Sequence, residues 1–168
     1  MSISFLPFVI INSITELTPE QLKKWKIQLL MLDFDNTIVP YTTSEPTEKV
    51  RSWLKMMLQT DIKICVVSNS KKPRVSVFCE KYGLECITHA AKPSQKGIMA
   101  CMDKFAVGAE NAALVGDQIF TDTLGGNCAG VKTILVEAIN NHNIWLKLRH
   151  VAEMPFICAA KNRRINHE

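Results

Sequence analysis

The chain has 168 residues, of which 47% are hydrophobic and 21% are charged, and its formal net charge is +4. This length and apolar content suit one domain with a single sizeable core. The net charge is too small to indicate a nucleic-acid-binding protein, but it is compatible with an anionic substrate. No run of about 18 apolar residues occurs, so the sequence predicts no helix that crosses a membrane.

The cysteines and the N-terminal segment bear on the compartment. Six cysteines are scattered without a CxxC pair, mostly within apolar runs, which favours reduced thiols packed as small hydrophobic side chains. The opening MSISFLPFVIIN has neither a basic start nor a small-residue cleavage site, so we expect no signal peptide. The sequence therefore predicts a cytoplasmic protein that is soluble, or at most peripheral at the inner surface of a membrane.

Helices and strands are predicted to alternate along the chain. The continuous apolar runs are typical of buried strands, and helices are expected where apolar residues recur at the spacing of one helix face. In the helix that begins at Pro46 this buried face comprises Val50, Trp53, Leu54, Met57 and Leu58. The expected order is helix 18–26, strand 28–34, helix 46–58, strand 62–67, helix 73–82, strand 84–88, helix 94–105, strand 112–115, helix 120–128 and strand 131–136.

This alternation predicts an α/β fold. Five strands would form a parallel sheet with helices on both faces, a Rossmann-like three-layer sandwich that binds ligands beyond the carboxyl ends of its strands. We expect a single domain over 1–168, with an N-terminal lead at 1–27, a core at 28–137 and a helical tail at 138–168.

Polar residues stand where three of these strands end. Asp33 and Asp35 close the first strand, Ser68 follows the second, and Asp117 follows the fourth. Two carboxylates so close together repel each other unless they share a proton or a cation. Hard divalent cations with oxygen ligands fit such a site, and Asp117 is the natural third carboxylate.

These residues belong to a set of motifs. The sequence DFDNT at 33–37, Ser68, Lys92 and GDQIFTD at 116–122 occur in order, each on the expected element. Together they resemble the motifs of the haloacid dehalogenase superfamily of phosphotransferases, and the resemblance covers nearly the whole fold. Alone, the aspartates could be turn or capping residues and Ser68 a loop hydroxyl, but the joint pattern favours catalysis.

The resemblance implies a phosphatase with an aspartyl-phosphate intermediate. Asp33 would be the nucleophile, and Asp35 would act as acid and then as base. Thr37 would help to hold Asp35 in place. Mg²⁺ would be bound by Asp33, the backbone carbonyl of Asp35 and Asp117.

The remaining motif residues would bind the phosphate. Ser68 would donate a hydrogen bond to the phosphoryl group, and Lys92 would place a positive charge beside it. Asn69 and its backbone amide are further candidate donors. Asp122 would support Lys92 or the metal ligands, although helix capping is an equally good explanation of its position.

Some superfamily members without a cap domain carry a structural zinc site between the second and third motifs. The candidates are Cys79, Cys86 and His89, but a closed zinc site normally needs four ligands, and Cys79 falls inside a predicted helix. Core packing is therefore the favoured interpretation of both cysteines.

The chain has no room for a cap domain between its motifs, so the site should be open. An open site favours a bulky substrate, a membrane surface, or an oligomer whose neighbour supplies the missing wall. The apolar lead, ITELTPEQLKKWKI, DNTIVP and GDQIFTDTLGGN resemble the YqeG-type group of capless members (subclass IIIA). Relatives of that group include phosphatidylglycerophosphate phosphatases, which implies an anionic lipid phosphate as substrate.

The two ends of the chain are rich in apolar and basic residues. The lead around 5–11 and the segment IWLKLRHVAEMPFICAAKNRR would suit an anionic lipid surface. Packing on the sheet edges is the stronger interpretation. Phosphatases of a soluble sugar, nucleotide or protein phosphate remain alternatives, as does an adaptor that has kept the fold without catalysis.

Overall fold

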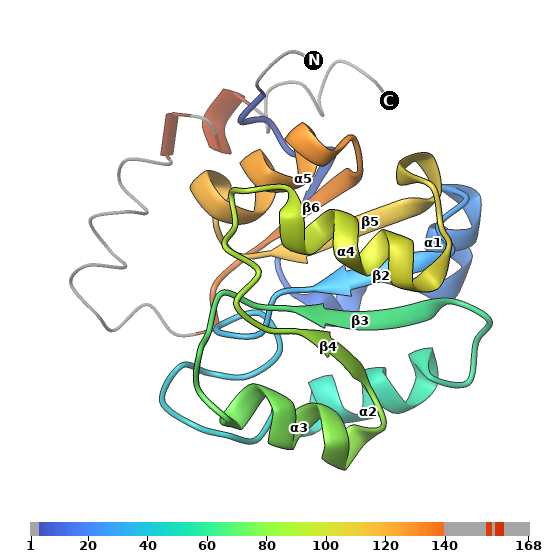
Figure 1. The fold of residues 1–168 in the computed structure, drawn as a ribbon, viewed down its shortest axis with the longest axis vertical. Coiled ribbons are helices and arrows are strands. Elements are labelled where there is room, and N and C mark those ends of the chain that lie inside the picture. The colour runs from blue at the N-terminus through green and yellow to red at the C-terminus, as the bar shows by residue number, and fades with distance from the viewer. Residues whose placement is uncertain (1–3, 140–153, 156, 160–168) are drawn as a thin grey trace.

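The protein forms a parallel six-stranded sheet in the order β1-β6-β5-β2-β3-β4 (Figure 1). The computed structural model describes residues 4–139, 154–155 and 157–159. The strands are β1 (Val9–Ile11), β2 (Leu29–Leu32), β3 (Lys63–Val67), β4 (Glu85–Ile87), β5 (Ala112–Gly116) and β6 (Lys132–Val136). The predicted α/β class and parallel sheet are confirmed, but the predicted number of five strands is wrong.

The additional strand, β1, comes from the N-terminal lead. It pairs in parallel with β6, with Val9 opposite Ile134 and Ile11 opposite Val136. Its three residues are too few to show a recognisable strand pattern, and only the neighbouring edge of β6 makes it a strand. The prediction that this lead packs on a sheet edge is confirmed.

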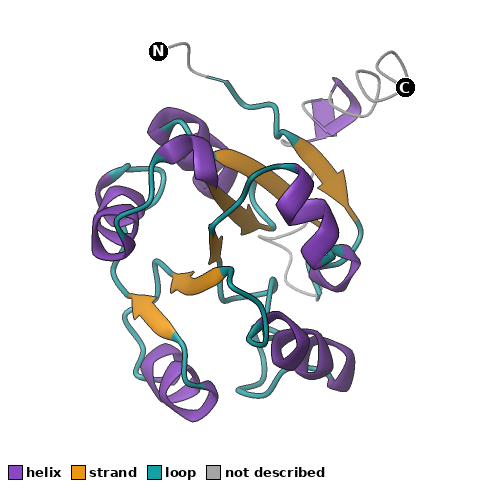
Figure 2. Cartoon of the chain, turned by 90° about the vertical axis from the view of Figure 1, so that its right-hand side faces the viewer, coloured by secondary structure: helices purple, strands orange, loops and turns teal. Residues whose placement is uncertain are grey.

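Helices cover both faces of the sheet, which confirms the three-layer arrangement (Figures 1 and 2). The helices α2 and α3 lie on one face, and α4 and α5 lie on the other. Each face has its own core: Leu30 and Leu32 of β2 contribute to one cluster, and Leu29 and Met31 to the other. The α-helices are α1 (Pro19–Lys24), α2 (Glu48–Met57), α3 (Arg74–Tyr82), α4 (Lys96–Phe105) and α5 (Leu124–Ala129).

Local sequence explains most helix boundaries. Thr18 and Gln21 form a capping box at the start of α1, and the Thr47 side chain caps α2. The α3 helix ends at Gly83, whose left-handed backbone (φ 65°) favours glycine. Leu58 was expected on the buried face of α2, but it is the residue that ends the helix and is 44% exposed.

The helix predicted at 120–128 is also different. Residues Ile119–Thr123 form a π-helical turn, and the α-helix begins only at Leu124. Such turns are rare and often occur at functional sites. Two 3-10 turns, Ile14–Glu16 and Ala109–Asn111, complete the connections.

All six cysteines are free thiols. Cys79 is buried in the core, and Cys86 packs against the same cluster. Within the described residues, no helix is long and apolar enough to cross a membrane. Of the helical tail predicted at 138–168, residues 154–155 and 157–159 are helical, residues 138–139 are not, and the rest lies outside the described residues.

Candidate active site

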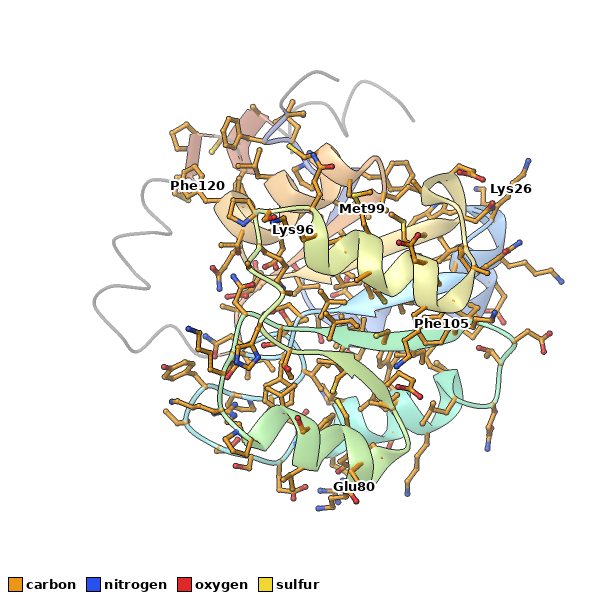
Figure 3. All side chains as sticks on the ribbon, viewed as in Figure 1. Lys26, Glu80, Lys96, Met99, Phe105 and Phe120 are labelled. Carbon is orange, nitrogen blue, oxygen red and sulfur yellow. The ribbon has the colours of Figure 1, made fainter. Side chains whose placement is uncertain are left out.

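A cavity of about 180 Å³ lies where β2, β3 and β5 end. In Figure 3 this end of the sheet is on the left, near Phe120, whereas Lys26 marks the opposite end. The structure brings Asp33, Ser68 and Lys92 together here, although they are far apart in the sequence. The cavity is lined by Asp33, Asp35, Asn36, Tyr41, Ser68, Asn69, Ser70, Lys92, Gln118 and Thr121.

Asp33 lies directly after β2, and its backbone N–H donates to the carbonyl of Val115 at 2.8 Å. This bond continues the pairing of β2 with β5. It fixes the Asp33 backbone, from which the side chain extends. The Oδ1 atom accepts a hydrogen bond from Lys92 Nζ at 2.6 Å. Burial raises the Asp33 pKa from 3.8 to about 7, against the opposing effect of the Lys92 charge, while the Asp122 charge adds to the rise.

Lys92 is a buried cation with three oxygen contacts. Its Nζ atom lies 2.6 Å from Asp33, 2.7 Å from Asp122 and 2.7 Å from the carbonyl oxygen of Val67. Burial alone would lower the Lys92 pKa, but the two carboxylates outweigh burial and raise it. The ammonium is therefore charged and held beside Asp33, where a phosphoryl group bound in the cavity would meet it.

Asp33, which lines the cavity, belongs to a cluster of three buried carboxylates. Oxygen atoms of Asp33, Asp117 and Asp122 all lie within 4.8 Å of one another. With all three ionised, their negative charges would exceed the single positive charge of Lys92, and burial makes such an excess unfavourable. Carboxylate oxygens at this spacing fit a hard divalent metal ion.

The fit of Asp122 depends on a glycine. A Cβ atom at Gly116 would lie 2.3 Å from the Asp122 carboxyl group, so only glycine leaves room for this side chain. The Asp122 Oδ2 atom accepts a hydrogen bond from Gln118 N at 3.2 Å, and Oδ1 lies beside Lys92. The π-helical turn thus places Asp122 against Lys92.

The side chain of Asp35 is half-buried and turns toward Arg74 instead of the carboxylate cluster. Asp35 Oδ1 lies 2.8 Å from Arg74 Nη2. Burial raises the Asp35 pKa, and the nearby charges of Arg74, Lys72 and Lys92 oppose that rise. Thr37 was predicted to hold Asp35, but its buried hydroxyl has no hydrogen-bond partner in the described part of the chain.

Arg74 is a site residue that the sequence analysis missed. Its guanidinium lies 5.0 Å from the centre of the Phe34 ring and donates to the carbonyl oxygen of Tyr41 at 2.9 Å. It thereby ties the segment after β2 to α3. A cation at the start of a helix opposes the helix dipole, so the position of Arg74 at the start of α3 was a signal that it has an anionic partner.

Ser68 and Asn69 follow β3. Ser68 is buried, and its hydroxyl accepts a hydrogen bond from Ser70 N at 3.1 Å, which leaves the hydroxyl proton available for a ligand. Asn69 lines the cavity, but both polar ends of its amide bind the backbone of Lys92. Gln118 and Thr121, which were not predicted as site residues, also line the cavity.

The comparisons with known proteins agree with this arrangement. The family model of haloacid dehalogenase-like hydrolases matches residues 4–136. The probable phosphatase YqeG of Bacillus subtilis is 36% identical over 132 residues, which cover 79% of this chain and 77% of that protein.

Two solved structures show the same fold. The cobalt-bound form of the deoxy-D-mannose-octulosonate 8-phosphate phosphatase YrbI from Haemophilus influenzae has a TM-score of 0.54 and 19% identity, over 76% of this chain and 77% of that one. An uncharacterized protein from Listeria monocytogenes has a TM-score of 0.56 and 15% identity, over 70% of this chain and 84% of that one. At these identities the matches support the fold alone.

Proposed function

The chain belongs to the haloacid dehalogenase-like hydrolases, and from that premise we propose that it is a Mg²⁺-dependent phosphatase that forms an aspartyl-phosphate on Asp33. The observation that carries this proposal is the contact of buried Asp33 with Lys92, beside a cluster of carboxylates and facing a small cavity. These contacts support a carboxylate nucleophile and a fixed cation that face one small cavity, with a candidate metal site beside them.

In the first step an oxygen of Asp33 attacks phosphorus. The bond from Asp33 to phosphorus forms as the bond to the leaving oxygen breaks, and Asp35 gives its proton to that oxygen. Ser68 donates a hydrogen bond to the phosphoryl group, and the Lys92 ammonium faces its negative charge. The Asn69 backbone amide is a further donor at the same strand end.

In the second step water attacks the phosphorus of the aspartyl-phosphate. Asp35, now ionised, removes a proton from this water, and the bond between Asp33 and phosphorus breaks. Inorganic phosphate leaves, and Asp35 is again protonated. One carboxyl group thus serves as acid and base in turn, and Arg74 keeps it at the mouth of the cavity.

Asp33, Asp117 and the backbone carbonyl of Asp35 would hold the metal ion, with Asp122 supporting them through Lys92. When bound, Mg²⁺ would offset the negative charge of the phosphoryl oxygens, so that the anionic nucleophile can approach the phosphorus atom.

For the substrate we propose an anionic lipid phosphate, phosphatidylglycerophosphate, which would yield phosphatidylglycerol. The similarity to the YqeG-type group supports this choice, as does the absence of room for a cap domain between the motifs. Such a substrate calls for a cytoplasmic protein that works at a membrane surface, or for a homo-oligomer that closes the site. A soluble sugar, nucleotide or protein phosphate is the alternative substrate.

Phosphate release tests this proposal. The native protein and Asp33→Asn are assayed with phosphatidylglycerophosphate micelles and with a panel of soluble phosphate esters, in Mg²⁺ or in EDTA. We expect turnover of the lipid that is lost in EDTA and in the variant. Turnover of soluble esters alone would reject the lipid substrate, and no turnover of any ester would favour a non-catalytic adaptor.

A further inference from the structure

The side chain of Asn69 forms two hydrogen bonds with the backbone of Lys92. Its Nδ2 donates to the Lys92 carbonyl oxygen at 2.8 Å, and its Oδ1 accepts from the Lys92 N–H at 2.7 Å. Since the backbone offers one donor and one acceptor, only this orientation of the amide satisfies both bonds. Asn69 therefore holds the main chain of the residue whose ammonium contacts Asp33.

The segment that carries Lys92 needs such support. His89 and Ala91 both have left-handed backbone conformations with φ of 56°, which non-glycine residues rarely adopt. Conformations of this kind persist only where the surrounding structure holds them. That support comes from the end of β3, where the Ser68 carbonyl accepts from Ala90 N at 3.0 Å and Asn69 binds Lys92.

The ammonium of Lys92 has little freedom to compensate for a displaced backbone. Its side chain is 1% exposed and ends in short contacts with Asp33, Asp122 and the Val67 carbonyl. A shift of the main chain would therefore lengthen the contact with Asp33 or with Asp122. Small displacements of a catalytic group have large effects on rate.

We propose that Asn69 is a positioning residue, which acts by fixing the backbone of Lys92 and thereby the place of its ammonium against Asp33. This role rests on the proposed phosphatase function and goes beyond the assignment of Asn69 as a phosphate ligand. The Asn69 amide keeps one N–H that is not used by Lys92, so a direct contact with phosphate is the competing explanation.

The two explanations predict different kinetics. With p-nitrophenyl phosphate, Asn69→Ala should lower kcat about 10- to 100-fold and leave KM within about 2-fold. Asn69→Gln should be similarly impaired, because a side chain one methylene longer cannot make both bonds in place. A raised KM with unchanged kcat, or full activity of Asn69→Gln, would overturn the positioning role.

A double-mutant cycle provides the sharper test. If Asn69 acts through Lys92, adding Asn69→Ala to Lys92→Met should change kcat by less than about 2-fold, whereas independent roles would multiply the losses. The matched control is Asn111→Ala. Asn111 Nδ2 also donates to a backbone carbonyl at 2.7 Å, that of Lys26, at the opposite end of the sheet from the cavity (Figure 3). This variant should keep native kcat.

Amide hydrogen exchange tests the support of the backbone without any turnover. Exchange at the Lys92 N–H should rise at least about 10-fold in Asn69→Ala and stay native in Asn111→Ala. Unchanged exchange in Asn69→Ala would overturn the inference even if Lys92→Met fails to fold. A native protein without phosphatase activity would instead reject the proposed function, so the two failures are distinguishable.

Discussion

Asp33→Asn should stabilise the metal-free protein above neutral pH. Burial raises the Asp33 pKa from 3.8 to about 7. In the folded state this carboxyl therefore keeps its proton at pH values where the unfolded chain has lost it. Between about pH 4 and pH 7 the folded state therefore binds more protons than the unfolded state. The contribution of Asp33 to stability falls as the pH rises through this range.

The size of this effect follows from the shift. A rise of the Asp33 pKa from 3.8 to about 7 corresponds to about 4 kcal/mol of unfolding free energy. Asparagine cannot ionise, so the variant should lack this pH dependence. For a domain of this size, about 4 kcal/mol corresponds to a rise of about 8–16 °C in Tm.

Thermal unfolding from pH 4 to pH 8 in EDTA measures the difference. Asp33→Asn should approach the native protein near pH 4 and exceed it at pH 8, and saturating Mg²⁺ should reduce the gap by stabilising the native protein. Asp103→Asn, which alters an exposed aspartate of α4, is the matched control and should follow the native curve. Parallel curves for the native protein and Asp33→Asn, or a less stable variant at pH 8, would show that burial does not raise the Asp33 pKa in the folded protein.

Three further substitutions test other parts of the site. Asp35→Asn should slow the first step, measured as release of the alcohol or phenol in a single turnover, by about 10²- to 10⁴-fold for alkyl phosphates and much less for p-nitrophenyl phosphate, because only the alkoxide needs a proton; equal losses in this step would contradict an acid role. Arg74→Met should lower kcat about 10-fold or more, and Arg74→Lys should recover part of the loss, since only arginine can contact both Asp35 and the Tyr41 carbonyl. Native kinetics of Arg74→Met would argue against a role of the contact between Arg74 and Asp35. Gly116→Ala should lose about 1–3 kcal/mol in denaturant unfolding together with most activity, because a Cβ atom there overlaps Asp122; a stable, active variant would show that Asp122 can move.

Local sequence patterns were sufficient to predict the buried strands and the end of the sheet that carries the site. The apolar runs of β2, β3 and β5 identify buried strands, and the polar residues that follow them identify the end of the sheet that carries the site. Parallel pairing then brings Asp33 and Ser68 to the same edge. The Lys92 contacts with Asp33 and Asp122 agree with the supporting role expected of Asp122.

The features that the sequence analysis missed depend on contacts between distant segments. β1 is a strand only because it pairs with β6. The ion pair of Arg74 with Asp35 joins α3 to the segment that follows β2. The bonds from Asn69 to the Lys92 backbone likewise depend on the path of the loop after β4. Periodicity and propensity describe neighbours along the chain, so they cannot specify contacts of this kind.

The proposed mechanism requires that Asp33 becomes phosphorylated during turnover. Native protein mixed with substrate and Mg²⁺, quenched in acid and digested, should yield a phosphorylated peptide that contains Asp33, detected by mass spectrometry. The same peptide from Asp33→Asn should carry no phosphate. Phosphate release without a labelled Asp33 peptide, or turnover retained by Asp33→Asn, would contradict the account.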